Sequence, residues 1–169
     1  MSAADPAGCG GTLFHVVLVE PEIPPNTGNV ARLCAAARCR LHLVGPLGFR
    51  MDDASLRRAG MDYWEFVDWR YHDSFGGVMG ARDPASAVYC VETTGGECYA
   101  DVRYRPGDYL VFGRETLGLR RATIEQAGGR CVRIPIAEPR ARSLNLSNSV
   151  AVVLYEALRQ NGFGCGGAD

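Results

Sequence analysis

The sequence predicts a single α/β domain with a mostly parallel sheet and helices on both of its faces. Uninterrupted apolar runs at residues 16–19, 87–91 and 109–112 are typical of parallel strands covered on both sides. Amphipathic stretches alternate with such runs, as expected for a sheet flanked by helices. A length of 169 residues suits one domain, and 47% hydrophobic residues are enough for one core.

The predicted elements lie within a body of residues 12–161. Short β-rich runs and amphipathic stretches alternate in the order 13–19, 29–37, 41–44, 53–59, 65–67, 74–80, 87–91, 109–112, 123–127, 132–134 and 148–160. Seven of the 21 glycines lie outside this body, at the two ends of the chain. We therefore expect residues 1–11 and 162–169 to be flexible tails.

Charge and cysteine content exclude several classes of function. The net charge is −1, so a nucleic acid would have to be bound by a local patch. All 18 basic residues are arginine, which excludes lysine Schiff-base and P-loop chemistry and leaves only cations suited to carboxylate or phosphate. Biased codon usage is the simpler explanation of this composition. Seven cysteines without a C-x-x-C pair fit neither a disulfide framework nor a zinc site, so we expect no metal. Cys34, Cys90 and Cys131 are predicted to pack as small core hydrophobes.

Neither end of the chain indicates export or membrane insertion. The N-terminal residues 1–11 lack the basic and apolar regions of a signal peptide. The longest apolar run, residues 150–155, is far shorter than the ~20 residues of a membrane helix. We expect a cytoplasmic protein that does not contact a membrane.

The first of three unusual loops, residues 20–29, follows the first predicted strand. In a parallel sheet the binding crevice lies beyond the carboxyl ends of the strands. The prolines predict a stiff, extended path, and Asn26 or Thr27 is predicted to cap the next helix. Arg32, one turn into that helix, is predicted to point toward the crevice. A rigid loop with a capped helix and no ligand is the alternative, since no nucleotide-binding glycine motif is present.

The second loop, residues 112–119, follows a fully apolar run. Gly113 permits either the close approach of a ligand to the backbone or a turn with positive φ. Glu115 and Arg114 could also form an ordinary exposed ion pair.

The third loop, residues 134–149, collects small polar side chains with Arg140 and Arg142 ahead of the last helix. Ser147 or Asn148 is predicted to cap this helix. The remaining donors are suited to orient a polar or anionic ligand at the helix N-terminus.

Together the three loops resemble the SPOUT superfamily of S-adenosylmethionine-dependent RNA methyltransferases. The patterns N-x-G-N-x-x-R at residues 26–32, F-G-x-E-x-x-G-L at 112–119 and S-L-N-L-S-N at 143–148 are similar to its three motifs, in the same order. Similarity at residues 20–29, 57–63 and 153–157 narrows the resemblance to the tRNA wobble-nucleotide (cytidine or uridine 34) 2′-O-methyltransferases. Arg114 and Leu117 are departures, because some relatives have Pro and Arg at these two positions.

The resemblance implies a C-terminal trefoil knot, that is, the SPOUT or α/β-knot fold, with S-adenosylmethionine as cofactor and tRNA as partner. By motif, it assigns cofactor binding to Glu92, Gly113, Ile134, Ser143 and Leu144. It assigns the catalytic base to Arg32. The residues that would position it or the ribose are Asn26, Glu115, Ser143 and Asn145. Contacts to RNA are expected from Arg142 and Arg114.

The last predicted helix, residues 148–160, predicts a homodimer. Its apolar residues occupy more than one helical stripe, whereas a helix that covers a sheet in a monomer needs only one. A second copy of the helix could cover the remaining stripe, with Tyr155 at the interface. The resemblance implies dimerisation through the same region. Burial of both stripes within one chain is the alternative.

Several alternatives remain open at this point. An arginine is a poor base, so Arg32 is equally a clamp on a phosphate or a developing alkoxide. His15, His42 and His72 are alternative bases, the first two within apparent strands and the third in a polar connector. The aromatic residues Tyr63, Trp64, Trp69 and Tyr71 could stack on bases or pack in the core. The substrate could be rRNA or another tRNA nucleotide, and a non-catalytic RNA-binding protein of the same fold is the rival function.

Overall fold

A seven-stranded sheet forms the centre of the domain. The computed structural model describes residues 11–50, 64–138 and 140–164. The strand order is β3-β2-β1-β6-β4-β7-β5, and every pairing between neighbouring strands is parallel. The strands are β1 (His15–Val19), β2 (Arg40–Val44), β3 (Trp69–His72), β4 (Val88–Val91), β5 (Glu97–Cys98), β6 (Tyr109–Phe112) and β7 (Cys131–Arg133).

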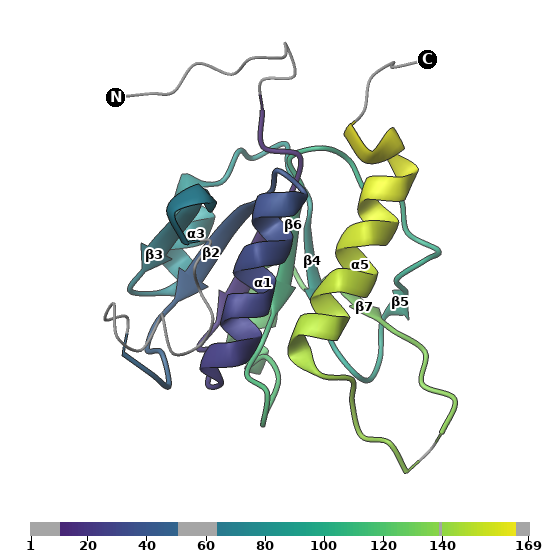
Figure 1. Cartoon of the computed structure of the whole chain (residues 1–169). Coiled ribbons are helices and arrows are strands. Elements are labelled where there is room, and N and C mark those ends of the chain that lie inside the picture. The colour runs from purple at the N-terminus through teal and green to yellow at the C-terminus, as the bar shows by residue number, and fades with distance from the viewer. Residues whose placement is uncertain (1–10, 51–63, 139, 165–169) are drawn as a thin grey trace.

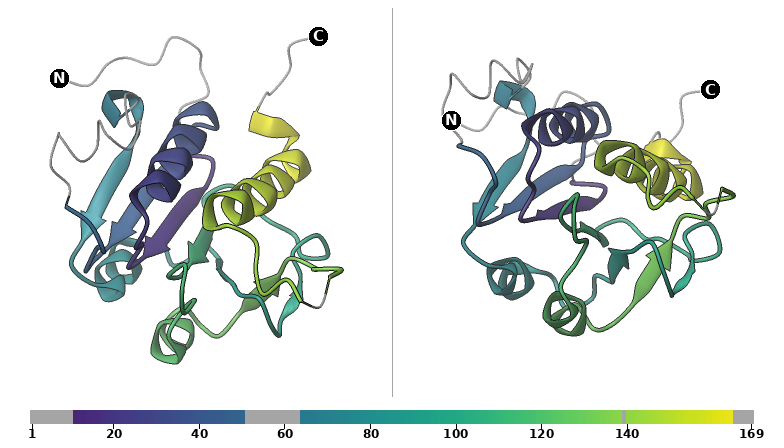
Figure 2. Two further views of the ribbon diagram at one scale, coloured as in Figure 1. Left: turned by 60° about the horizontal axis from the view of Figure 1, so that its bottom comes forward. Right: turned by 90° about the horizontal axis from the view of Figure 1, so that it is seen from below.

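Helices cover both faces of the sheet, as predicted. The helices are α1 (Pro24–Ala36), α3 (Phe75–Ala81), α4 (Arg121–Gln126) and α5 (Leu146–Gln160), with 3-10 turns η1 (Trp64–Phe66) and η2 (Gly162–Gly164). Figures 1 and 2 show α1 and α5 side by side on one face, and α3 and α4 on the other. The α/β class, the single domain and the parallel sheet are therefore confirmed.

Each face of the sheet has its own core. The strands alternate their side chains between the faces, so β1 sends Val16 and Leu18 toward α1 and α5, and Val17 and Val19 toward α3 and α4. The runs predicted as strands covered on both sides, at residues 16–19, 87–91 and 109–112, lie at β1, β4 and β6 in the middle of the sheet. Cys34 and Cys90 are fully buried and Cys131 packs against the core, as predicted.

The predicted boundaries were wrong at the margins of the sheet. The run at 65–67 lies at η1, and the edge strand β3 follows it instead. The short outer strand β5 was missed because it contributes only two residues. His72, predicted in a polar connector, is the last residue of β3. Edge strands carry polar, partly exposed residues and so lack the apolar run that marks central strands. The predicted element at 53–59 lies outside the described residues.

Trp64 and Trp69 pack against the core at this margin rather than standing free for base stacking. Their rings lie 4.8 Å apart between centroids, and both side chains are partly buried. Tyr71 is about half exposed, at 48%, on β3. Tyr63 lies outside the described residues.

Candidate functional site

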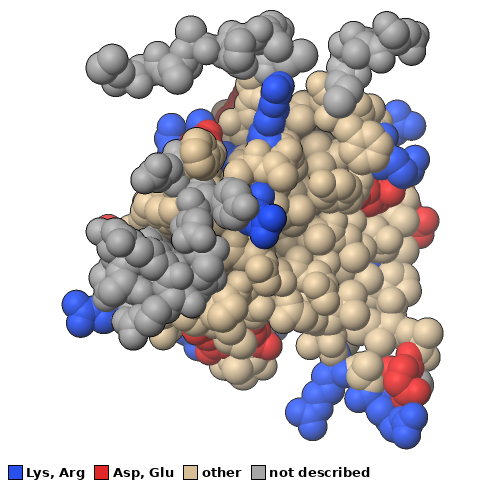
Figure 3. Space-filling view, in the orientation of Figure 1, with Lys and Arg blue, Asp and Glu red and all other residues tan. Residues whose placement is uncertain are grey.

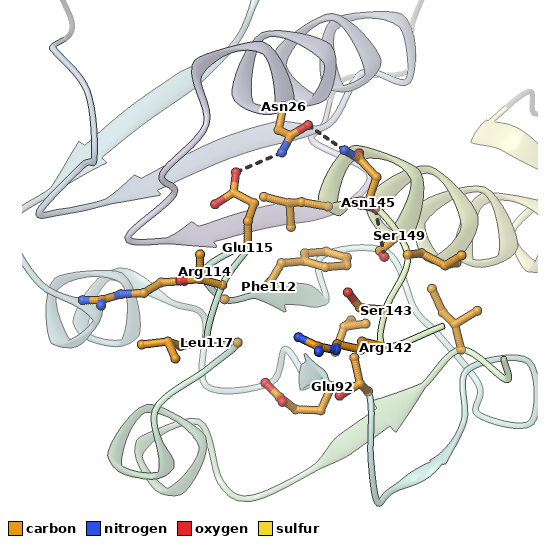
Figure 4. A pocket seen from close by; sticks show the side chains of 18 of the residues that line it. Asn26, Glu92, Phe112, Arg114, Glu115, Leu117, Arg142, Ser143, Asn145 and Ser149 are labelled. Atoms are coloured by element: carbon orange, nitrogen blue, oxygen red, sulfur yellow. Dashed lines mark hydrogen bonds between the residues drawn. The ribbon is translucent and has the colours of Figure 1, made fainter. Parts of the chain in front are cut away.

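A cavity of about 410 Å³ opens at the carboxyl ends of β4, β6 and β7. This is the edge at which a parallel sheet binds ligands, and the volume suits a nucleoside-sized molecule. Figure 4 shows side chains from all three predicted loops around it. Among its lining residues are ten of the predicted site residues: Asn26, Glu92, Gly113, Arg114, Glu115, Ile134, Arg142, Ser143, Leu144 and Asn145.

A chain of hydrogen bonds joins the three loops across this cavity. Asn26 Nδ2 donates to Glu115 Oε1 at 3.1 Å, and Asn145 Nδ2 donates to Asn26 Oδ1 at 2.9 Å. Asn26 is buried, at 5% exposure, and both ends of its amide are paired. A buried amide paired at both ends is held in one orientation. The sequence placed these three residues in one site, and the structure brings them into contact.

Helix α1 begins five residues earlier than predicted, at Pro24. Prolines are tolerated in the first helical turn because the amide hydrogen they lack would be unpaired there. The predicted caps are therefore wrong: Asn26 and Thr27 lie inside the helix, and the N-cap is Ile23, without a side-chain cap. The acceptor comes from Glu115, whose carboxylate accepts from the backbone N–H groups of Glu22 (2.8 Å) and Ile23 (3.1 Å).

Helix α5 is capped by Asn145 rather than by the predicted Ser147 or Asn148. Asn145 Oδ1 accepts from the backbone N–H groups of Ser147 (2.9 Å) and Asn148 (3.4 Å). The helix therefore begins two residues earlier than expected, at Leu146. Because the other end of the Asn145 amide contacts Asn26, the cap of α5 is tied to the first turn of α1.

Position 113 requires a glycine because the backbone of residues 118–119 passes very close to it. A Cβ at this position would lie 2.2 Å from the carbonyl carbon of Gly118, which no side chain could avoid. The loop closes through two hydrogen bonds between the backbones of Arg114 and Gly118. The predicted turn with positive φ is wrong, because Gly113 does not have a positive φ. The close approach that the structure shows is to the chain itself, and the approach of a ligand stays a prediction.

Glu92 supplies a carboxylate to the floor of the cavity. Its Oε1 accepts from the backbone N–H of Leu119 at 2.9 Å, which anchors the end of the 113–119 loop. Burial raises the pKa of Glu92, and the bond from Leu119 partly opposes this. Gly118, with φ of +66°, leaves room beside this carboxylate, since a Cβ there would come within 3.2 Å of Oε2.

The three arginines of the predicted site have different settings. Arg114 forms an ion pair with Glu20, which also pairs with Arg120 at 3.0 Å. Arg142 lines the cavity and has no ion pair or hydrogen bond among the described residues. Arg32 was predicted one turn into its helix and pointing to the crevice. Because α1 starts at Pro24, Arg32 lies in the third turn, is exposed and does not line the cavity.

None of the three histidines lines the cavity. They lie on the strands β1, β2 and β3, whereas the cavity opens at the carboxyl ends of β4, β6 and β7. Their role as alternative bases has no support from this geometry. Within the described residues, no group of three or more His, Cys, Asp or Glu side chains could hold a metal ion, and no described helix is long and apolar enough to span a membrane.

Sequence reasoning missed Glu22 and Thr116, which connect the first two loops. Glu22 accepts hydrogen bonds from the backbone N–H (3.1 Å) and the hydroxyl (2.8 Å) of Thr116. Two acidic residues flanking a proline at 20–22 were a visible signal, because carboxylates in a loop with few bases need donors from elsewhere in the chain.

A family model described as the SpoU rRNA Methylase family matches residues 13–155. This chain belongs to that family. A protein of Polaromonas named tRNA (cytidine(34)-2′-O)-methyltransferase is 52% identical to this methylase, over 89% of this chain and 93% of the relative. A protein of the same name from Escherichia coli is 45% identical, over 89% of this chain and 96% of the relative.

Solved structures agree with these relatives. One, described as giving structural insights into the 2-OH methylation of C/U34 on tRNA, matches with a TM-score of 0.83 and 44% identity, over 90% of this chain and 99% of that one. The SpoU methyltransferase AviRb from Streptomyces viridochromogenes, in complex with the cofactor AdoMet, matches with a TM-score of 0.77 and 26% identity. This match covers 90% of the methylase and 62% of AviRb.

Proposed function

We propose that this methylase transfers a methyl group from S-adenosylmethionine to the ribose 2′-hydroxyl of the wobble nucleotide, position 34, of tRNA. The observation that carries the proposal is the hydrogen-bonded chain Glu115–Asn26–Asn145, which assembles all three motif loops around one cavity. The relatives named for this reaction match nearly the full length of the domain. Since tRNA is the substrate, we also propose that the protein acts in the cytoplasm.

The cofactor fits the cavity by size and by the groups that line it. Gly113, Ile134, Ser143 and Leu144 offer backbone donors and acceptors, and Glu92 offers a carboxylate oxygen. Backbone groups held by a closed loop bind a ligand without the entropy cost of ordering long side chains. When bound, S-adenosylmethionine supplies an electrophilic methyl group and its own leaving group.

The chain's own residues must then hold the ribose oxygen in line with that methyl group and help to remove or stabilise the proton of the 2′-hydroxyl. We assign this to Arg32, with Asn26, Glu115 and Asn145 as positioning residues. A guanidinium keeps its proton at physiological pH, so Arg32 acts better as a clamp on a phosphate or on the developing alkoxide than as a base. Its exposed position on α1, outside the cavity, supports a role toward the RNA rather than toward the cofactor.

The RNA backbone is expected to meet Arg142 first. Figure 4 shows Arg142 at the cavity with its guanidinium directed across it, and it has no partner among the described residues. Arg114 would have to give up its ion pair with Glu20 to bind a phosphate. Arg142 is therefore the stronger of the two RNA contacts that the motifs indicate.

We further propose a homodimer through α5. The helix buries one stripe, which includes Val150, Val153 and Leu154, and leaves Tyr155 47% exposed beside Phe163. Figure 3 shows that much of the surface over α5 is uncharged. We expect light scattering to give twice the mass of one chain and Tyr155→Arg to give a monomer. Phe66→Arg, at an exposed aromatic residue away from α5, is the control.

We also infer that the C-terminal segment is knotted. Strand β7 lies between β4 and β5, although the chain makes both of those strands more than 30 residues earlier. The chain then leaves β7 to place α5 on the opposite face from α4, which supports threading through the 92–108 connection. A crystal structure with this segment passing outside that connection would contradict the inference.

The function is tested with purified protein, S-adenosylmethionine and bulk bacterial RNA. We expect methyl groups in the tRNA fraction, located by nuclease digestion and mass spectrometry at the ribose of nucleotide 34. Methylation of rRNA or of another tRNA nucleotide would overturn the substrate assignment. Cofactor binding by calorimetry separates these outcomes from a non-catalytic RNA-binding protein, which would bind RNA and not the cofactor.

A further inference from the structure

Two loops of this protein are joined by two glutamate side chains, each of which accepts hydrogen bonds from the other loop. Glu115, on the 113–119 loop, accepts from the backbone N–H of Glu22 at 2.8 Å. In return Glu22, on the loop after β1, accepts from the backbone N–H of Thr116 at 3.1 Å and from its hydroxyl at 2.8 Å. Bonds to a charged acceptor are stronger than bonds between neutral groups. Glu115 accepts from the backbone of Glu22, and the adjacent Thr116 donates to the side chain of Glu22, so each loop both donates and accepts.

The two carboxylates differ in their relation to the cavity. Glu115 and Thr116 line it, whereas Glu22 does not. Among the described residues, every side-chain or backbone hydrogen bond of Thr116 is donated by Thr116 to the Glu22 carboxylate. The next residue, Leu117, is 76% exposed and so gains little from packing. The Arg114–Gly118 and Leu119–Glu92 bonds hold the ends of the loop, and Thr116 between them depends on Glu22 for its attachment.

Glu22 is itself fixed from the other side. The backbone N–H of Gly48 donates to the carbonyl of Pro21 at 2.9 Å, and a Cβ on Gly48 would come within 2.8 Å of Glu22 Cα. The loop after β2 thus packs tightly against the backbone of Glu22. Glu22 can hold Thr116 in place because its own backbone is held at this contact.

We propose that Glu22 is a positioning residue for the cofactor pocket, which it serves by fixing residues 116–118 as part of the cavity wall. The proposal rests on the cofactor site proposed above. It concerns a residue that does not line the cavity. Loss of its carboxylate would let the wall move and weaken cofactor binding, while the transfer step with the cofactor already bound would proceed as before.

The test compares Glu22→Ala and Glu22→Gln with the wild-type enzyme. For Glu22→Ala we expect the cofactor Kd and KM to rise about tenfold, as for loss of hydrogen bonds to a charged group. The kcat at saturating cofactor and the KM for tRNA should stay unchanged. Glu22→Gln keeps one carbonyl acceptor and should fall between the two. Glu125→Gln, at an exposed glutamate of α4, is the matched control.

The combination with Thr116 separates positioning from general stability. If Glu22 acts through Thr116, then Thr116→Val should weaken cofactor binding less in the Glu22→Ala background than in wild type. Thr116→Ser, which keeps the hydroxyl, should behave as wild type. Additive effects, or a fall in melting temperature with no change in cofactor Kd for Glu22→Gln, would overturn the proposal. Absence of cofactor binding by the wild-type enzyme would instead overturn the proposed function.

Discussion

Two chains of polar side chains cross this molecule, and they differ in where they lie on the sheet. One joins Glu115, Asn26 and Asn145 at the carboxyl ends of the strands, beside the cavity. The other joins His15, His42 and His72 across β1, β2 and β3. Both bring together residues distant in sequence through hydrogen bonds of about 3 Å. Only the first lines the cavity described above.

The histidine row is built into the layer beneath α3 and α4. His15 and His42 are hydrogen-bonded at 2.9 Å, and His42 and His72 at 3.0 Å. The ring of His15 stacks on Tyr109 with 4.2 Å between centroids. Burial lowers the pKa of His15 to about 4 and that of His42 to about 3, so both are neutral at pH 7. A strongly shifted pKa therefore indicates a functional site only where a cavity lies beside the group.

The largest expected effect is on the RNA side of the site. Arg32→Ala should lower the single-turnover rate of methyl transfer about 100-fold or more, as for loss of a charge that stabilises a transition state. The cofactor Kd, measured by calorimetry, should stay unchanged because Arg32 does not line the cavity. Arg32→Lys, which keeps a charge, should recover part of the rate. An equal loss of cofactor affinity would show that Arg32 serves the cofactor pocket and would contradict its role toward the RNA.

The second prediction separates two roles of Asn145. Asn145→Ala removes the cap of α5 and should lower the free energy of unfolding by about 1 kcal/mol, measured in urea. Asn145→Asp keeps an acceptor for the cap but loses the donor to Asn26. It should therefore keep the cap of α5 and lose methyl-transfer activity. If Asn145→Asp remains fully active, the contact with Asn26 has no role in the reaction.

The third prediction concerns pH and the histidine row. The folded state depresses the pKa of His42, so its contribution to stability is present above about pH 6.5 and is lost as the pH falls toward 3. Through that range the free energy of unfolding should fall by about 1.4 kcal/mol per pH unit from His42 alone. Urea unfolding at several pH values measures this slope. His42→Gln should reduce this slope of the free energy of unfolding against pH by the contribution of one proton. An unchanged slope would show that His42 does not titrate as its buried position requires.

The sequence predictions succeeded in the centre of the sheet and failed at its margins. The central strands were predictable because residues such as Val17, Leu110 and Val111 are apolar without interruption and are fully buried. The margins were not, since Tyr71 and His72 look the same in an edge strand and in a loop. The start of α1 was missed because Pro24 and Pro25 suit both an extended loop and a first helical turn.

The site residues were predictable as a set, but their contacts were not. Asn26, Glu115 and Asn145 stand in three motifs separated by up to 119 residues, and no spacing shows that one amide would contact both partners. The cap at Asn145 was assigned to its neighbours for a similar reason. Several side chains near a helix start can cap it, and the contact with Asn26 determines which one is held in place.

The smallest expected effect tests the comparison most directly. His72 lies at the outer end of the row, only partly buried, and makes one hydrogen bond to His42. Glutamine can replace that bond, so His72→Gln should change the free energy of unfolding by less than about 1 kcal/mol. The methyl-transfer rate and the cofactor Kd should both equal those of wild type, because the row does not reach the cavity. A loss of rate as large as that of Arg32→Ala, in a protein that unfolds at the same urea concentration, would make the histidine row part of the catalytic machinery.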